Sequence, residues 1–290
     1  MELISTFVNG LGLGGIYAMI ALGYTMVYGI AKMLNFAHGD IIMVGGYTIL
    51  VFMNATGNPI LATALAVVFC VLLGIAVERL AYKPLRGASP LAVLITAIGV
   101  SYLLQSLALI IFGSASRMIA LPNFGVVTVG GMRIQGYTLF TLACTVVVCT
   151  ALTFFIKFTR LGKAMLAVSE DRGAAQLMGI NVNMIITLTF VIGSALASLA
   201  GLCILLKAPS IGSTFGSMPG IKAFTAAVIG GIGSIPGAML GGILLGVVES
   251  FCNKIAVIAP YTDAIEFGIL IIILLIRPTG FLGKKRREKV

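Results

Sequence analysis

Long apolar runs with very few charges constrain this chain more than any other feature. They cover about residues 3–30, 36–53, 59–77, 90–112, 137–156, 184–206, 223–248 and 264–276. A transmembrane helix needs about 20 mostly apolar residues, and the chain is 59% hydrophobic but only 10% charged. A β-barrel would instead show alternating strands of about ten residues. The sequence therefore predicts an all-α fold, a polytopic bundle of membrane helices that forms one domain over residues 1–290.

The basic residues predict how this bundle lies in the membrane. Most of the 19 lysines and arginines follow the third, fifth and last apolar runs. They are Arg79, Lys83 and Arg86, then Lys157, Arg160, Lys163 and Arg172, and finally Arg277 and the tail 284–289. The positive-inside rule places these connections in the cytoplasm, with the N-terminus outside and the C-terminus inside. The loop 113–136 then lies outside, where its β-branched residues favour short extended structure. Topology accounts for the net charge of +10, so we expect no nucleic-acid partner.

The run 223–248 conflicts with a simple count of spans, because the chain lies outside both before and after it. Two complete membrane helices need about 40 residues, which is more than this run contains. We therefore expect about seven full spans plus a glycine-rich re-entrant hairpin of two short helices over residues 222–250. Its turn falls at residues 230–236, where glycines allow close helix packing or line a path through the protein.

A second break, with Lys32, Asn35, His38 and Asp40, separates the first two runs. Ionisable groups within a membrane are usually functional, and broken helices can mark a transport site. The alternative is a structural or gating turn at the cytoplasmic end, where Lys32 and Asp40 contact water and headgroups. The candidates for a translocation path are Asn35, Phe36, His38, Gly39, Asp40, Thr225, Gly230, Gly231 and Gly233.

The segment 160–182 is long, charged and helix-forming, and it cannot lie in lipid. Its spacing predicts two short helices, each with an apolar face. The faces consist of Ala164, Met165, Ala167 and Val168, and of Ala174, Ala175, Leu177 and Met178. Ser169 is the expected N-cap of the second helix, Glu170 and Asp171 its first turn, and Gly179 its end. The segment is either a linker lying on the membrane or a docking site.

Several stretches resemble, in the same order, the branched-chain amino acid permease family of ABC importers, LivH type. They are residues 34–40 (Leu-Asn-Phe-Ala-His-Gly-Asp), 167–180, 222–234, 236–242 and 277–281. The resemblance covers nearly the whole chain. It implies that the segment 160–182 couples the permease to a cytoplasmic ATPase. The contacting residues would be Ser169, Glu170, Asp171, Arg172, Gly173, Ala174, Ala175, Gln176, Leu177, Met178 and Gly179.

The resemblance also implies partners and a location. A permease of this family works in the bacterial inner membrane with a second homologous permease subunit of LivM type. Two cytoplasmic ABC ATPase subunits drive it, and a periplasmic amino-acid-binding protein supplies leucine, isoleucine or valine. The chain contains no Gly-x-x-x-x-Gly-Lys-Ser/Thr phosphate loop. We therefore expect ATP and Mg to bind the ATPase subunits, and no cofactor, metal site or catalytic residue in this chain.

The sequence leaves two alternative functions open and disfavours a third. A permease for urea or short amides would share the same motifs. An ion-coupled secondary transporter would need ion ligands in the spans but no ATPase. An intramembrane enzyme is disfavoured, because His38 has no serine partner in a nucleophile motif and no aspartate pair is evident.

Overall fold

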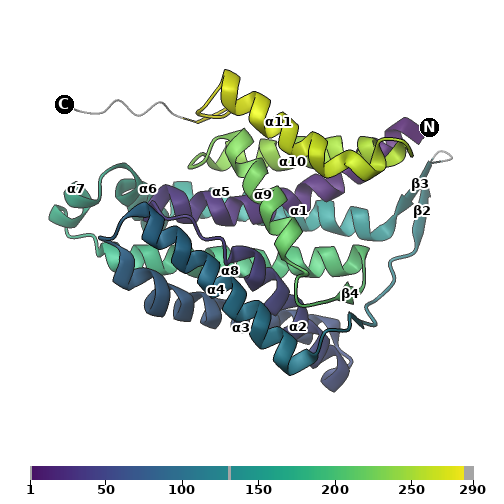
Figure 1. Ribbon diagram of the computed structural model, residues 1–290, viewed down its shortest axis with the longest axis horizontal. Coiled ribbons are helices and arrows are strands. Elements are labelled where there is room, and N and C mark those ends of the chain that lie inside the picture. The colour runs from purple at the N-terminus through teal and green to yellow at the C-terminus, as the bar shows by residue number, and fades with distance from the viewer. Residues whose placement is uncertain (1, 130–131, 284–290) are drawn as a thin grey trace.

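The computed structural model describes residues 2–129 and 132–283, and these form a helical bundle (Figure 1). Its α-helices are α1 Glu2–Ala31, α2 His38–Thr56, α3 Pro59–Val77, α4 Pro90–Phe112, α5 Gly136–Phe158, α6 Arg160–Glu170, α7 Arg172–Leu177, α8 Val182–Lys207, α9 Ser217–Gly230, α10 Ile235–Lys254 and α11 Thr262–Ile276. Within this described part, eight helices are long and apolar enough to cross a membrane. The predicted polytopic helical fold is confirmed. The basic tail 284–289, which supports the predicted orientation, lies outside the described residues.

The helix α1 forms the centre of the bundle and is buried along most of its length. It packs against α5, α8, α9 and α10. The contact with α10 is tight, since a Cβ atom on Gly246 would lie only 2.1 Å from the backbone nitrogen of Gly14. Small residues allow such close backbone approach between membrane helices. The packing role expected for the glycines of the run 223–248 is therefore seen at this position.

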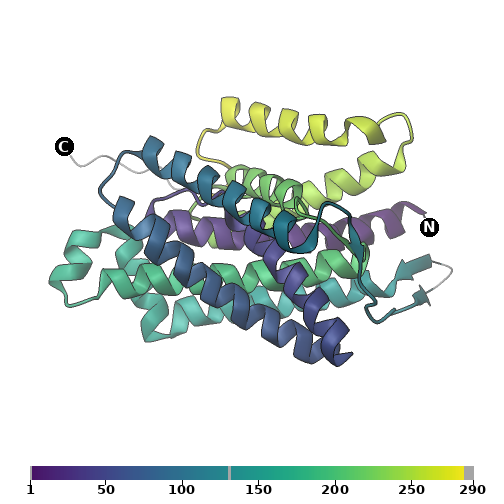
Figure 2. The ribbon, with the colours of Figure 1, turned by 60° about the horizontal axis from the view of Figure 1, so that its bottom comes forward.

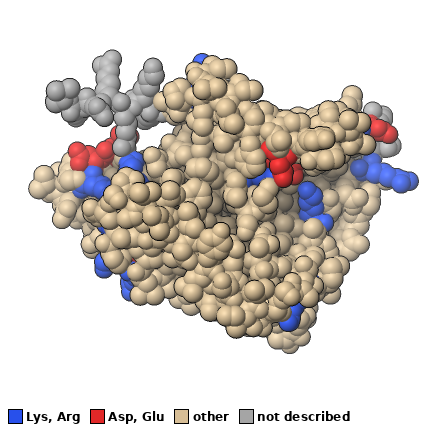
Figure 3. All heavy atoms as spheres, viewed as in Figure 1, with Lys and Arg blue, Asp and Glu red and all other residues tan. Residues whose placement is uncertain are grey.

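The helices α3, α4, α5 and α11 lie at the periphery and expose large apolar side chains. Ile60 is 81% exposed, Ile110 78% and Leu275 80%. A soluble monomer rarely exposes an apolar surface of this extent. Most charged side chains in Figure 3 lie towards the two ends of the long axis. This distribution is that of a multi-pass membrane protein, whose periphery faces lipid.

The two ends of the bundle differ in structure (Figure 1). One end carries α6 and α7, and the other carries the hairpin of β2 (Val126–Val129) and β3 (Met132–Gln135). Beyond these, β1 (Arg117–Met118) pairs antiparallel with β4 (Ser210–Ile211). The short extended structure expected between residues 113 and 136 is therefore confirmed.

The helices α9 and α10 are joined by a turn where the sequence predicts one, and α11 lies along their edge of the bundle (Figure 2). The first arm, α9, has 14 residues and is short as expected. The second arm, α10, has 20 residues and is longer than expected. It begins at Ile235, because Ser234 caps the helix and Pro236 lies in the first turn, where proline is tolerated. The re-entrant path of this hairpin stays a prediction.

Candidate coupling face and translocation path

Residues 160–182, named the coupling segment after their expected role, fold at one end of the bundle as α6 and α7 (Figure 1). The hydroxyl oxygen of Thr159 caps α6 by accepting a hydrogen bond of 3.0 Å from the amide of Gly162. Met165 and Val168 are buried, each 1% exposed. The predicted apolar face of the first helix therefore packs against the bundle, where α6 contacts α1, α5 and α8.

The boundary between α6 and α7 differs from the prediction by two residues. The N-cap of α7 is Asp171, whose carboxylate accepts a 3.0 Å hydrogen bond from the amide of Ala174. Ser169 and Glu170 instead end α6, because the hydroxyl of Ser169 donates to the carbonyl of Leu166 within that helix. Ser169 was therefore wrong as the cap. Gly179 follows α7 with a left-handed φ of 81°, so the expected stop is confirmed.

The apolar face predicted for α7 is not buried. Ala175 alone of its four residues is buried, while Leu177 is 90% exposed and Met178 82% exposed. A helix of six residues turns only one side to the bundle, and Ala175 occupies that side. Two large apolar side chains are thus left uncovered at the end of the molecule, together with the exposed residues Glu170, Asp171, Gly173, Ala174, Gln176 and Gly179.

Arg172 connects this uncovered helix to the centre of the bundle. Its guanidinium donates a hydrogen bond of 2.9 Å to the carbonyl of Ile30, in the last turn of α1. Burial, together with the nearby charge of Arg86, lowers the pKa of Arg172 from its usual value. Close by, Arg86 pairs with Glu78 and donates to Asn183. The coupling segment therefore contacts α1 directly, just before the break at residues 32–37.

The break between α1 and α2 leads back into the bundle. His38, the first residue of α2, is 1% exposed and lies edge-on to Tyr24 with ring centroids 4.8 Å apart. Asp40 is 2% exposed and accepts a 2.9 Å hydrogen bond from Gln105 of α4. Burial of Asp40 is incompatible with the alternative in which this residue contacts water and headgroups.

Asn35 is also held inside, where its side-chain oxygen accepts a 2.8 Å hydrogen bond from the hydroxyl of Tyr82. Tyr82 and Gln105 were not predicted, because each lies far along the chain from the residue that it contacts. The side chains of Asn35 and Asp40 are thereby both satisfied by neighbouring helices, as buried polar groups require.

A second helix also begins in the interior, beside α2. The chain 212–216 leads to the start of α9, and a Cβ atom on Gly39 would lie 2.7 Å from the carbonyl oxygen of Gly216. Phe224 of α9 packs on Phe36 and Tyr24, with ring centroids 5.3 Å and 5.7 Å apart. Thr225 follows Phe224 and is buried. The structure thus brings Phe36, His38 and Gly39 together with α9.

The glycines of the α9–α10 turn lie apart from the interior break between α1 and α2. The backbone of Phe281 donates to the carbonyl of Ile229, and that of Leu282 to the carbonyl of Gly230, both at 2.9 Å. A Cβ atom on Gly231 would collide with the backbone of Gly283. The chain after α11 therefore covers Gly230 and Gly231, and the structure does not bring them to His38. Their role in a path stays a prediction, as does that of Gly233.

The structure contains a charge cluster that was not predicted from the sequence, in which Asp263 is exposed and the other charged residues are buried. The ammonium of Lys222 lies 2.8 Å from Asp263, 3.1 Å from Glu249 and 3.2 Å from Glu266. The hydroxyl of Tyr17 donates a 2.6 Å hydrogen bond to Glu249. The four charged residues join α9, α10 and α11 to one another, and Tyr17 joins them to α1. The signal that points to such a cluster is charge within an apolar run or at its edge, although spacing alone does not pair the residues.

A bundle of membrane-length helices, in which two helices begin side by side in the interior, is typical of a multi-pass transport permease. A family profile described as "Branched-chain amino acid transport system / permease component" matches residues 6–274. The chain therefore belongs to this family of permease components.

Individual relatives match over nearly the full length. The chain is 45% identical to the high-affinity branched-chain amino acid transport system permease protein BraD of Pseudomonas aeruginosa, over 99% of this chain and 98% of that protein. It is 42% identical to the corresponding permease protein LivH of Escherichia coli K12, over 97% of this chain and 96% of that protein. A probable branched-chain amino acid transport permease protein LivH of Methanocaldococcus jannaschii is 27% identical, over 91% of this chain and 88% of that protein.

Proposed function

We propose that this chain is the permease subunit of an ABC importer that moves leucine, isoleucine and valine across the bacterial inner membrane. The observation that carries the proposal is the identity of 45% and 42% to two such permeases, without large gaps in coverage. The N-terminus lies outside and the C-terminus in the cytoplasm. The chain has no catalytic activity of its own, and ATP and Mg bind partner subunits.

Four partners complete the transporter: a second homologous permease of LivM type, two cytoplasmic ATPases and a periplasmic amino-acid-binding protein. The uncovered side chains of Leu177 and Met178 support the ATPase contact, because an exposed apolar patch rimmed by polar residues is typical of a protein interface. Glu170, Asp171 and Gln176 form its polar rim. Arg172 then passes movement of α7 to α1 through Ile30.

Charge reversal at the coupling segment tests this function. The double variant Glu170→Lys, Asp171→Lys should abolish binding-protein-dependent leucine uptake and reduce the amount of ATPase that co-purifies with the permease. Glu2→Lys is the matched control, since Glu2 is 88% exposed on α1 and lies outside the coupling segment. Normal uptake with an intact complex in the double variant would overturn the coupling role.

The substrate is tested separately with the binding protein encoded beside the permease. Calorimetry should show tight binding of leucine, isoleucine and valine. Affinity for urea or acetamide, without affinity for leucine, would assign the chain to the urea and amide alternative.

One observation favours the ion-coupled alternative: the Lys222 cluster supplies charged groups among the membrane helices. Depletion of ATP with ion gradients held constant distinguishes the two. We expect uptake to stop, whereas uptake that continues under these conditions would establish secondary transport.

A further inference from the structure

A small pocket opens between α1, α5, α8 and α10, and none of the candidate path residues lines it. Its volume is about 180 Å³, and it is lined by Asn9, Gly12, Leu13, Ile16, Tyr137, Thr138, Thr141, Lys207, Ser250 and Asn253. Pockets for drug-sized ligands have about 300–1,000 Å³, so this one is limited to a small molecule. The pocket lies at the start of α1 and α5 and the end of α8 and α10, which is the outer end in the proposed orientation.

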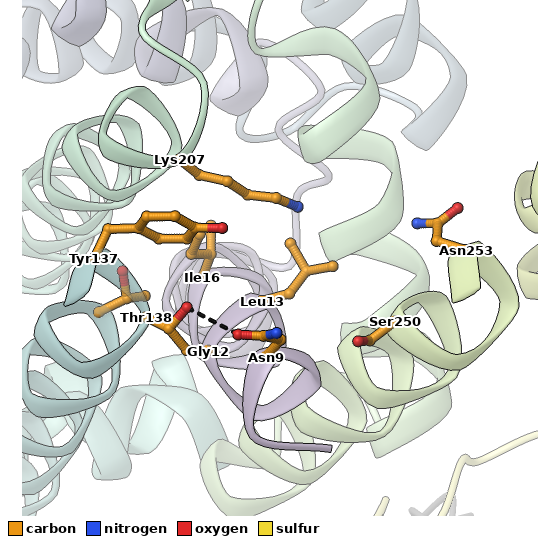
Figure 4. Close-up of a pocket in the computed structure, with 10 residues that line it drawn as sticks. Asn9, Gly12, Leu13, Ile16, Tyr137, Thr138, Lys207, Ser250 and Asn253 are labelled. Carbon is orange, nitrogen blue, oxygen red and sulfur yellow. Dashed lines mark hydrogen bonds between the residues drawn. The ribbon is translucent and has the colours of Figure 1, made fainter. Parts of the chain in front are cut away.

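The two asparagines of the lining each present a hydrogen-bond donor to the pocket. The side-chain oxygen of Asn9 accepts from the hydroxyl of Thr138 at 3.2 Å, and that of Asn253 accepts from Thr262 at 3.0 Å. Each amide therefore keeps its NH₂ group for another partner. Figure 4 shows the amide nitrogens of Asn9 and Asn253 and the ammonium of Lys207 turned towards the same open space.

The positive charge of Lys207 is not neutralised locally. Among the residues that the structure describes, no carboxylate lies within 4.0 Å of its ammonium, whereas the acids of the adjacent helices are already paired. Glu249 is held by Lys222 and Tyr17, and Glu2 is paired with Lys254. An ammonium flanked by two amide donors is complementary to a carboxylate, because charge-assisted hydrogen bonds are the strong ones.

Part of the pocket wall is apolar. Leu13 and Ile16 lie one turn apart on α1 and form its floor beside Gly12 (Figure 4). A ligand with a carboxylate at one end and a short hydrocarbon chain at the other matches both halves of the lining. Ser250 and the oxygen of Asn9 offer acceptors for a neighbouring amino group.

We propose that this outer pocket, centred on Lys207, binds the carboxylate of a small apolar amino acid. This inference rests on the proposed function, since it assigns the imported substrate a place on the permease itself. Lys207 binds the carboxylate, Asn9 and Asn253 orient it, and Leu13 and Ile16 contact the hydrocarbon side chain.

A fluorescence titration tests the proposal on the full-length chain in lipid nanodiscs. The chain contains no tryptophan, so Tyr137→Trp places a single reporter in the pocket wall. We expect a saturable signal with leucine and with 4-methylpentanoate, which keeps the carboxylate, but not with leucinamide, which lacks it. Ligand-detected saturation-transfer NMR on the chain without the reporter provides the same comparison if the tryptophan fills the pocket.

Substitution of the lysine gives the second arm. Lys207→Gln should weaken leucine binding at least about tenfold, since each tenfold corresponds to about 1.4 kcal/mol, while Lys207→Arg should retain it. Lys254→Gln is the matched control, because it removes a basic residue near the end of α10 that does not line the pocket. Equal responses to leucine and leucinamide, or unchanged binding in Lys207→Gln, would overturn the proposal.

Two further outcomes separate the possible sources of an anion. Leucine should bind the permease with the same affinity in nanodiscs of neutral phosphatidylcholine and in nanodiscs of anionic phosphatidylglycerol. Loss of leucine binding in the anionic discs would assign the pocket to a lipid phosphate and refute the amino-acid site. If the whole transporter imports leucine but the pocket binds no carboxylate, this inference fails and the proposed function stands. If the pocket binds leucine but the transporter does not import it, the pocket assignment stands and the proposed function fails.

Discussion

The guanidinium of Arg172 donates a hydrogen bond to the backbone carbonyl of Ile30 across 2.9 Å, which joins α7 to the last turn of α1. A hydrogen bond from a charged donor contributes about 1.5–3 kcal/mol. Because Ile30 directly precedes the interior break at residues 32–37, this contact links the surface helix to the part of the bundle where α2 and α9 begin.

Arg172→Ala should therefore lower transport more than it lowers ATP hydrolysis. In proteoliposomes that contain the whole importer, we expect the ratio of leucine imported to ATP hydrolysed to fall severalfold, with partial recovery in Arg172→Lys. Arg79→Ala is the control, because Arg79 is an exposed basic residue that follows α3. A parallel loss of both activities would show that Arg172 only supports assembly.

Leu177→Glu combined with Met178→Glu should leave the permease stable but separate it from its ATPase. Both side chains are exposed, and surface substitutions usually change stability by less than about 0.5 kcal/mol. Membrane levels should stay normal while the co-purified ATPase decreases. Val168→Glu provides the contrast, because Val168 is 1% exposed and a buried charge there should lower the amount of folded permease itself.

Lys222→Met should destabilise the bundle strongly. It leaves Glu249 and the fully buried Glu266 without their ammonium partner, and breaking a buried ion pair costs about 3–5 kcal/mol. Thermal unfolding in detergent should show a clear loss. Lys254→Met, whose partner Glu2 is 88% exposed, should cost less than about 1 kcal/mol. Similar unfolding temperatures for the two variants would refute the importance of the cluster.

Gly23→Ala should disturb the interior break. A Cβ atom there would lie 2.4 Å from Nε2 of His38, and overpacking of this kind costs about 1–3 kcal/mol. The double variant Gly23→Ala, His38→Ala should be less destabilised than the sum of the single variants. Gly99→Ala is the control, because a Cβ atom at Gly99 meets open space; we expect it to be neutral or slightly stabilising.

Hydropathy predicted most of the helices, and in places their ends. The run 90–112 coincides with α4 because Ser89 caps that helix and Gly113 follows it. The polar break after α1 was equally visible. Its partners were not, since Tyr82 lies 47 residues from Asn35 and Gln105 lies 65 residues from Asp40. Such pairs depend on how helices rotate against one another, which periodicity does not encode.

The same limit applies to the charge cluster and to α7. Lys222 and its three acids lie on three helices, and their meeting point is fixed only by packing. In α7, the spacing of Ala175 and Leu177 fits burial or exposure equally well, because a helix of six residues is too short for its apolar pattern to determine which side is covered.

The hydrogen bonds from Phe281 to Ile229 and from Leu282 to Gly230 also constrain the order in which the protein is assembled. The carbonyl groups at the end of α9 receive these partners only after residue 282 has left the ribosome. Closure of the α9–α10 turn is therefore a late step of biogenesis that follows synthesis of α11. A chain truncated after Ile276 would contain every long helix but would lack the hydrogen-bond donors of Phe281 and Leu282, which complete the end of α9.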